Sequence, residues 1–148
     1  MGWDCLINLL KIIMSNLEKT LSIIKPDAVE RNLDHQIKEI FIRKGFLIKN
    51  EKKIQIEKSE AEKFYKVHET KPFYNDLCTY LSSGPIVAMV LEKENAVLEN
   101  RELMGATNPK DAAEGTIRKK YGISIDKNSV HGSDSVENAK IEIDFFFK

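Results

Sequence analysis

The chain has 148 residues, which suits one domain with a single hydrophobic core. Apolar residues make up 42% and charged residues 31%, an ordinary mixture for a soluble globular protein, and the formal net charge is zero. A general nucleic-acid binder normally carries a basic excess, so we expect no stable nucleic-acid binding, and any phosphate site must rest on a few placed cations.

Residues 1–16, MGWDCLINLLKIIMSN, differ in character from the rest of the chain. Their apolar run is too short to span a bilayer, so no membrane span is expected. Asp4 also stands where a secretory signal would carry positive charge. Four apolar residues have the spacing of a short amphipathic helix: Leu6, Leu9, Leu10 and Ile13. We interpret residues 1–16 as a non-catalytic extension and residues 17–148 as the functional domain.

The first part of the domain predicts a strand, a helix and a second strand. Residues 20–25, TLSIIK, form an apolar run rich in β-branched residues that Pro26 and Asp27 end. A helix is predicted from Asp34, which can cap it, to Gly45, which can close it. The following residues, 46–56, alternate apolar and polar near their end, as in a strand.

Two helices and a further strand are predicted next. Ser59 followed by Glu62 has the pattern of a capping box, which predicts the start of a helix there. The Lys71-Pro72 pair breaks that helix, and residues 73–81 predict another short one. After a Ser-Gly-Pro turn, residues 86–91 form a second fully apolar strand.

The last part of the chain predicts a helix from Asn95, a long irregular stretch over residues 105–129, and a final helix. A doubtful strand lies near residues 129–131. One face of the final helix carries four apolar residues: Val136, Ala139, Ile143 and Phe146. This order of elements predicts an α+β sandwich, an antiparallel sheet covered on one face by helices.

The segment NSVHGSDS places His131 between β-type residues and the start of a helix, where free backbone amides favour an anion. A neutral imidazole is a competent nucleophile near pH 7, whereas a serine hydroxyl needs an added base. Glu142 lies on roughly the same helix face as Ser135 and is predicted to hold the imidazole in one tautomer. Taken alone, however, an isolated histidine is more often a surface or core-edge residue.

Other polar residues supply the cations that a phosphate site needs. Arg101 and Arg118 bracket the irregular stretch around Thr107, and a guanidinium presents a planar fork of donors to phosphate oxygens. Lys25 ends an apolar strand directly before Pro-Asp. Each of these residues also has an ordinary explanation as solvated surface. Two aromatic residues, Tyr65 and Phe73, flank the Lys71-Pro72 break and are suited to stack on a nucleobase, although such residues are more often core.

In combination, these segments resemble the nucleoside diphosphate kinase family. The resemblance runs from about Leu17 to the last residue and rests on TLSIIKPDAVER, PFYNDL, SSGPIVAMVLEKENAV, NRELMGATNP, GTIRKKYG and NSVHGSDSVENAKIEI. It implies a ferredoxin-like βαββαβ fold with a four-stranded antiparallel sheet, which also supplies the doubtful strand. Asn32 and Asn100 depart from the glycine that many members have, and the extension has no counterpart in a typical member.

The resemblance also implies a role for each matching residue. His131 corresponds to the phosphorylated histidine, Glu142 to the glutamate that supports it, and Ser133 to the serine beside it. The remaining matches are nucleotide contacts. The arginines and threonine, Arg101, Arg118 and Thr107, hold phosphates; Lys25 and Asn128 reach the ribose hydroxyl; Phe73 stacks on the base; and Tyr65 is a further contact. Lys25 is counted with the catalytic residues as well. Mg²⁺ is expected to ride on the nucleotide phosphates and not in a protein cage.

We therefore expect a cytoplasmic, ATP-using phosphotransferase that passes the γ-phosphate to nucleoside diphosphates by a ping-pong mechanism. The two cysteines, Cys5 and Cys78, lack disulfide or metal-ligand spacing, in keeping with a reducing compartment. A homo-oligomer is expected, a hexamer before a tetramer, because the loop around Pro109 resembles a trimer-forming loop of the family. Two alternatives are a non-enzymatic interaction protein on the same fold and a small regulatory ferredoxin-like module.

Overall fold

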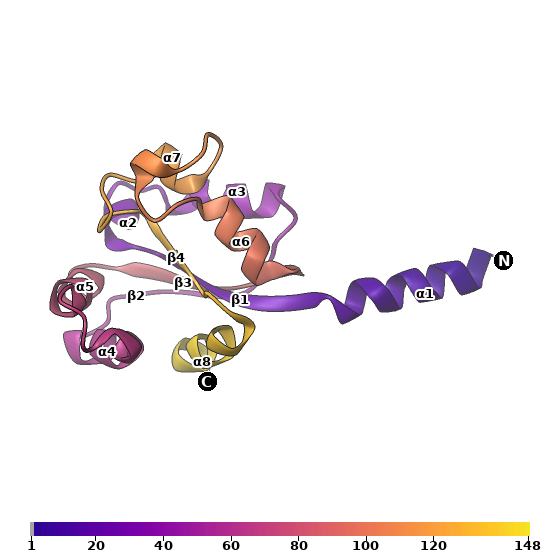
Figure 1. The fold of residues 1–148 in the computed structure, drawn as a ribbon, viewed down its shortest axis with the longest axis horizontal. Helices are drawn as coiled ribbons and strands as arrows, with labels where there is room; N and C mark the ends of the chain where they lie inside the picture. The colour runs from indigo at the N-terminus through magenta and orange to yellow at the C-terminus, as the bar shows by residue number, and fades with distance from the viewer. Residues whose placement is uncertain (1) are drawn as a thin grey trace.

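A computed structural model describes residues 2–148, with the side chains of residues 12–15 left aside. The domain is built on a four-stranded antiparallel sheet in the order β2-β3-β1-β4 (Figure 1). Its strands are β1 (Leu17–Ile24), β2 (Leu47–Ile54), β3 (Ile86–Glu94) and β4 (Val130–Gly132). This confirms the predicted ferredoxin-like α+β fold, and β4 confirms the fourth strand expected near residues 129–131.

Helices cover both faces of the sheet, not one face as we had predicted (Figure 1). One face carries α2 (Pro26–Glu30), α3 (Asp34–Arg43), α6 (Ala96–Met104) and α7 (Ile117–Tyr121). The other carries α4 (Lys58–Phe64), α5 (Tyr74–Leu81) and α8 (Val136–Phe147). The physical reason lies in β1 and β3, which are buried at consecutive positions and so present apolar side chains to both sides.

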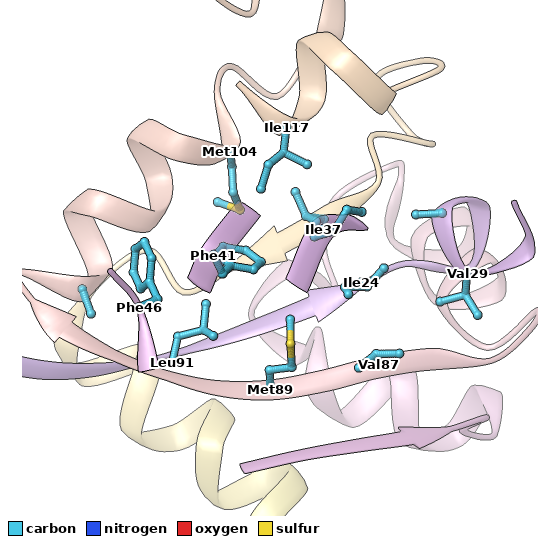
Figure 2. Close-up of a cluster of buried hydrophobic side chains, with 13 residues drawn as sticks. Ile24, Val29, Ile37, Phe41, Phe46, Val87, Met89, Leu91, Met104 and Ile117 are labelled. Atoms are coloured by element: carbon cyan, nitrogen blue, oxygen red, sulfur yellow. The ribbon is translucent and has the colours of Figure 1, made fainter. Parts of the chain in front are cut away.

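The core on the α3 side centres on Phe41, which is fully buried and meets the ring of Phe46 edge-on, with centroids 5.6 Å apart (Figure 2). Met89 and Leu91 of β3 pack beneath it, and Ile117 joins from α7. Burying a side chain of this size contributes about 1.5–3 kcal/mol. This cluster fixes α6 and α7 over the sheet, and these two helices carry the arginines predicted to hold phosphate.

The core on the opposite face joins α4, α5 and α8 to the sheet. Leu21 and Ile23 of β1 are fully buried there, and Tyr65 and Phe146 close the cluster. Phe146 lies near the end of α8, so its burial fixes the helix that carries Glu142. The spacing-based prediction for α8 is right for Ala139 and Phe146, whereas Val136 is 39% exposed at the first turn.

Helix boundaries differ from the predictions where capping is concerned. The capping box of α4 is formed by Glu57 and Glu60, not by Ser59 and Glu62. Asp34 makes no side-chain cap, because α3 begins after Leu33. The stretch predicted to be irregular, residues 105–129, contains α7 and a short 3-10 helix, η2 (Pro109–Asp111). A second 3-10 helix, η1 (Lys66–His68), follows α4. These elements have three to five residues, too few to show a periodic apolar pattern.

The extension forms the predicted helix, α1 (Gly2–Ser15), which projects away from the domain (Figure 1). Residues 2–11 are all exposed, and Trp3 keeps 80% of its surface accessible. This part of the helix therefore does not pack on the domain. Within residues 2–148, every helix is too short or too polar to cross a bilayer.

Candidate active site

His131 lies in the middle of β4, where it pairs in register with Ile23 of the central strand β1. Its Nε2 atom lies 3.0 Å from Oε1 of Glu142, which reaches up from α8. Ser133 donates a second hydrogen bond to the same carboxylate oxygen at 2.8 Å, while its own hydroxyl accepts from the amide of Leu21. The Glu142 carboxylate is thus held by two side chains, one in β4 and one directly after it.

The contact with Glu142 determines which ring nitrogen of His131 is available for chemistry. An ionised carboxylate only accepts hydrogen bonds, so Nε2 must carry the ring proton when it bonds to Glu142. A neutral imidazole protonated at Nε2 keeps its lone pair on Nδ1. The contact with Glu142 therefore leaves the lone pair of Nδ1 available, and the carboxylate is placed to stabilise a positive charge on the ring.

Aromatic rings restrict how the imidazole can turn. The ring of Phe64 meets His131 edge-on at 5.4 Å between centroids, and Tyr65 does so at 6.2 Å. Phe64 is itself held by Phe146 of α8 at 5.3 Å. Phe64 was not predicted as a site residue, because nothing in its local sequence separates it from an ordinary core residue.

Gly132 allows helix α6 to approach the strand beside His131. A Cβ atom at this position would lie 2.7 Å from Cε of Met104 and would also collide with the side chain of Asn100. Both residues belong to α6, which carries Arg101 as well. The absence of a side chain at position 132 therefore brings the arginine-bearing helix next to the histidine.

A cavity of about 250 Å³ opens between α6, the following loop and β4. Arg101, Thr107 and Arg118 line it together with Gly132, the neighbour of His131. Arg118 is buried and donates to the carbonyl oxygens of Gly105 at 3.0 Å and Val130 at 2.9 Å. Its burial, and then the nearby charge of Arg101, lowers the pKa of Arg118 to about 10. The cavity thus holds two guanidinium groups, which suits an anion with several oxygens.

Lys25 and Asn128 form a buried pair beside this cavity. Nζ of Lys25 donates to Oδ1 of Asn128 at 3.0 Å, and Nδ2 of Asn128 donates to the carbonyl oxygens of Thr107 at 3.0 Å and Ile125 at 3.1 Å. Burial, followed by repulsion from Arg118, lowers the pKa of Lys25 to about 8. A ligand with negative charge or several hydroxyl groups would stabilise this ammonium group, because its oxygens would replace the water that burial has removed.

Aromatic residues continue from His131 towards the surface. Tyr65 is buried, and desolvation followed by the charge of Glu142 raises the pKa of its hydroxyl. The ring of His68 lies 6.2 Å from Tyr65 and 5.9 Å from Phe73, which is 47% exposed. His68 is half-buried between these two rings. Phe73 is thus partly exposed at the rim, where Nζ of Lys71 lies 5.9 Å from its ring centroid.

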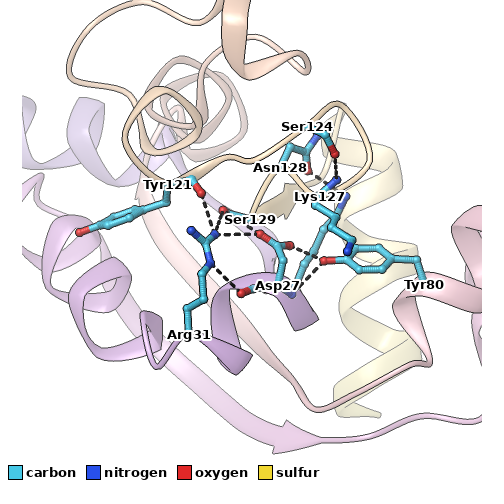
Figure 3. Close-up of polar contacts among 9 residues, drawn as sticks. Asp27, Arg31, Tyr80, Tyr121, Ser124, Lys127, Asn128 and Ser129 are labelled. Atoms are coloured by element: carbon cyan, nitrogen blue, oxygen red, sulfur yellow. Dashed lines mark hydrogen bonds and ion pairs between the residues drawn. The ribbon is translucent and has the colours of Figure 1, made fainter.

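All nine predicted site residues consequently fall around one region, and a second polar cluster adjoins it (Figure 3). The side chain of Asp27 is 3% exposed and accepts hydrogen bonds from Arg31 at 3.1 Å, from Ser129 at 3.1 Å and from the hydroxyl of Tyr80. Sequence analysis assigned none of these four residues to the site. The one available signal was the position of Ser129, two residues before His131.

Groups of three or more His, Cys, Asp or Glu side chains placed to hold a metal ion do not occur within the described part of the chain. At the cavity, the lining side chains that carry charge are the cationic Arg101 and Arg118. The nearby carboxylate of Glu142 is engaged by His131 and Ser133. This donor set suits an anion that brings its own metal ion.

Comparison with known proteins gives consistent results. A family model described as nucleoside diphosphate kinase matches residues 18–148. The chain is 60% identical over 131 residues to a nucleoside diphosphate kinase of Campylobacter lari, covering 88% of this chain and 96% of that protein. It is 58% identical over 131 residues to a nucleoside diphosphate kinase of Wolinella succinogenes, with the same coverage.

Solved structures agree with these sequence relatives. The structure of the Aquifex aeolicus nucleoside diphosphate kinase superposes with a TM-score of 0.88 at 42% identity, covering 89% of this chain and 96% of that one. The structure of nucleoside diphosphate kinase from Encephalitozoon cuniculi gives a TM-score of 0.85 at 39% identity, covering 88% of each chain.

Proposed function

Since the chain belongs to the nucleoside diphosphate kinase family, and is thus an enzyme that moves phosphoryl groups between nucleotides, we propose that it works through a phosphohistidine on His131. The observation that supports this most is the 3.0 Å contact of Nε2 with Glu142, which leaves the lone pair of Nδ1 free to attack phosphorus. The product is a pros-phosphohistidine.

The reaction has two half-reactions that share this intermediate. In the first, Nδ1 of His131 forms a bond to the γ-phosphorus of a nucleoside triphosphate, typically ATP. The bond from phosphorus to the β–γ bridging oxygen breaks, and the diphosphate leaves with that electron pair. In the second, a terminal oxygen of another nucleoside diphosphate attacks the same phosphorus, and the N–P bond breaks. Glu142 balances the imidazolium charge in both directions.

The remaining residues position the nucleotide, and positioning and charge neutralisation supply most of the catalysis in phosphoryl transfer. Arg101 and Arg118 bind phosphate oxygens in the cavity beside Gly132. The other contacts are those that the resemblance to the family implies: Thr107 on phosphate, Lys25 and Asn128 on the sugar hydroxyl, Tyr65 as a further contact, and Phe73 stacked on the base. Mg²⁺ carried by the nucleotide phosphates would neutralise part of their charge.

We also propose that the enzyme is cytoplasmic and works as a homo-oligomer, a hexamer before a tetramer. Strand β2 lies at one edge of the sheet, so its outer backbone groups face away from the chain's own strands. Leu47 on this strand is 56% exposed. A second copy of the chain could cover both. A mass measurement in solution tests this, and a monomer at micromolar concentration would contradict it.

The central experiment measures intact-protein mass after incubation with ATP and Mg²⁺ in the absence of an acceptor. Wild type should gain one phosphate per chain and lose it when a diphosphate is added. The linkage should be labile in acid and persistent in alkali, as expected for a phosphoramidate and opposite to a phosphoserine. His131→Gln should gain no transferable phosphate. His35→Gln is the matched control, because His35 is exposed on α3 and its side chain keeps 83% of its accessible surface.

Glu142→Gln separates the orienting role from the nucleophile. A hydrogen bond to a charged group contributes about 1.5–3 kcal/mol, so turnover should fall roughly 10- to 150-fold without loss of the phosphoenzyme. Phosphate on His131→Gln at the level of wild type would overturn the assignment of the nucleophile.

A further inference from the structure

Ser129 has an unusual backbone conformation two residues before His131. Its φ is 75°, in the left-handed region that glycine adopts readily and other residues seldom do. The residue is also fully buried. The amide of Val130 donates to the carbonyl oxygen of Asn128 at 2.9 Å, which closes a three-residue turn around Ser129. Such a turn needs outside contacts to persist, because the conformation is unfavourable by itself.

Two contacts from the start of the chain hold the turn in place. The Ser129 hydroxyl donates to Oδ2 of Asp27 at 3.1 Å (Figure 3). The carbonyl oxygen of Ser129 accepts from the amide of Lys25 at 2.9 Å. The turn is thereby attached to the end of β1, on the same segment that presents the Lys25 side chain to Asn128.

Asp27 is itself held firmly. Its carboxylate accepts from Nη2 of Arg31 at 3.1 Å and from the hydroxyl of Tyr80, and the Tyr80 oxygen also accepts from the amide of Asp27 at 2.8 Å. The same Arg31 nitrogen donates to the carbonyl oxygen of Tyr121 at 2.7 Å and lies 3.4 Å from the Ser129 hydroxyl (Figure 3). Helices α2, α5 and α7 thus meet at one buried carboxylate.

From this arrangement we propose that Asp27 and Ser129 are positioning residues for the nucleophile. Asp27 holds the left-handed turn at Ser129, and the turn directs Asn128 towards Lys25 on one side and sets the place of His131 on the other. Neither residue touches the reacting atoms. The proposal rests on the phosphohistidine mechanism proposed above and adds contacts that hold the residues before His131 in place.

Ser129→Gly is the most informative test. Glycine adopts the left-handed conformation without penalty, so the fold should survive, but the contact with Asp27 is lost and the turn becomes free to move. We expect the rate of phosphoenzyme formation at saturating ATP and Mg²⁺, followed by rapid mixing, to fall about 10- to 100-fold, because small displacements of reacting groups cost this much. kcat should fall more than KM rises, while the melting temperature stays within a few degrees of wild type.

Ser124→Ala is the matched control, since the Ser124 hydroxyl accepts from the amide of Lys127 in the same loop and has no contact with Asp27 among the hydrogen bonds of the described residues. It should react at the wild-type rate. Asp27→Asn should slow phosphoenzyme formation as well, and if this variant does not fold, Ser129→Gly decides alone. Wild-type kinetics in folded Ser129→Gly would overturn the proposal. A wild-type enzyme that forms no phosphoenzyme would instead contradict the mechanism on which the proposal rests.

Discussion

Replacing Lys25 with methionine should leave the free enzyme at least as stable as wild type while weakening its binding of nucleotide. The ammonium group is buried, and the pKa of Lys25 is lowered from 10.5 to about 8, first by desolvation and then by Arg118. Holding the charge in this site therefore costs about 3 kcal/mol at neutral pH. Methionine has a similar length and no charge, but it leaves Oδ1 of Asn128 without the Lys25 donor, which costs about 1–3 kcal/mol. The free energy of unfolding should thus stay constant or rise by up to about 2 kcal/mol.

The pH dependence gives an independent check on the same group. Because the pKa of Lys25 is lower in the folded than in the unfolded state, its destabilising effect is complete below pH 8 and fades as the pH rises towards 10.5. From pH 7 to pH 9.5, the unfolding free energy of wild type should gain about 2 kcal/mol relative to Lys25→Met. Urea denaturation at the two pH values measures this difference, and Lys127→Met, at an exposed lysine, is the control.

Nucleotide affinity should fall in Lys25→Met, in contrast to its free energy of unfolding. Titration with ADP and Mg²⁺ should show weaker binding to Lys25→Met than to wild type at pH 7. Above pH 8, wild-type affinity should fall as the lysine loses its proton, whereas the affinity of the variant should lack this component. A loss of more than about 3 kcal/mol of unfolding free energy in Lys25→Met at pH 7 would refute the reasoning, because the ammonium would then be stabilising the fold.

Three further changes test other parts of the structure. Gly132→Ala should cost about 1–3 kcal/mol of stability and reduce turnover, because the new methyl group collides with Met104; unchanged activity would mean that α6 can move aside without cost. Deleting residues 1–13 should leave turnover nearly unchanged in an activity assay, since residues 2–11 are exposed, and a large loss in folded protein would contradict our interpretation of the extension. Phe73→Ala should raise KM for purine and pyrimidine diphosphates alike, because stacking contributes about 1–3 kcal/mol per base whatever its identity. A change for one base alone would point to a specific contact.

Much of the fold could be predicted because its central strands carry strong local signals. β1 and β3 are continuous apolar runs, and α3 and α8 have apolar residues at helical spacing. The weak predictions concern short elements whose conformation depends on distant contacts. β4 has three residues and exists because β1 offers it a partner. The same apolar runs argue against our prediction of helices on one face only. A strand in which apolar and polar residues do not alternate needs cover on both faces of the sheet.

The residues of the site also divide into those that a local sequence pattern predicts and those that depend on contacts distant in sequence. His131 and Glu142 could be placed together because Glu142 lies two helical turns beyond Ser135, the N-cap residue of α8, on the helix face that is turned towards His131. The contact between Asp27 and Ser129 joins residues 102 apart, and Tyr80 lies 53 residues from Asp27. No local pattern predicts such pairs. Serine also has no marked preference for the left-handed region, so the turn before the histidine could not be recognised from residue type.

The spread of the site along the chain has a consequence for synthesis. Leu21 and Ser133 are 112 residues apart in sequence, Lys25 and Asn128 are 103 apart, and Glu142 belongs to the last helix. Contacts of such long range form slowly, because the loop between them must close first. A chain emerging from the ribosome therefore has β1 and β3 long before it has His131 and Glu142. Nucleotide stabilises only the finished protein, so it favours completed molecules over partly folded ones.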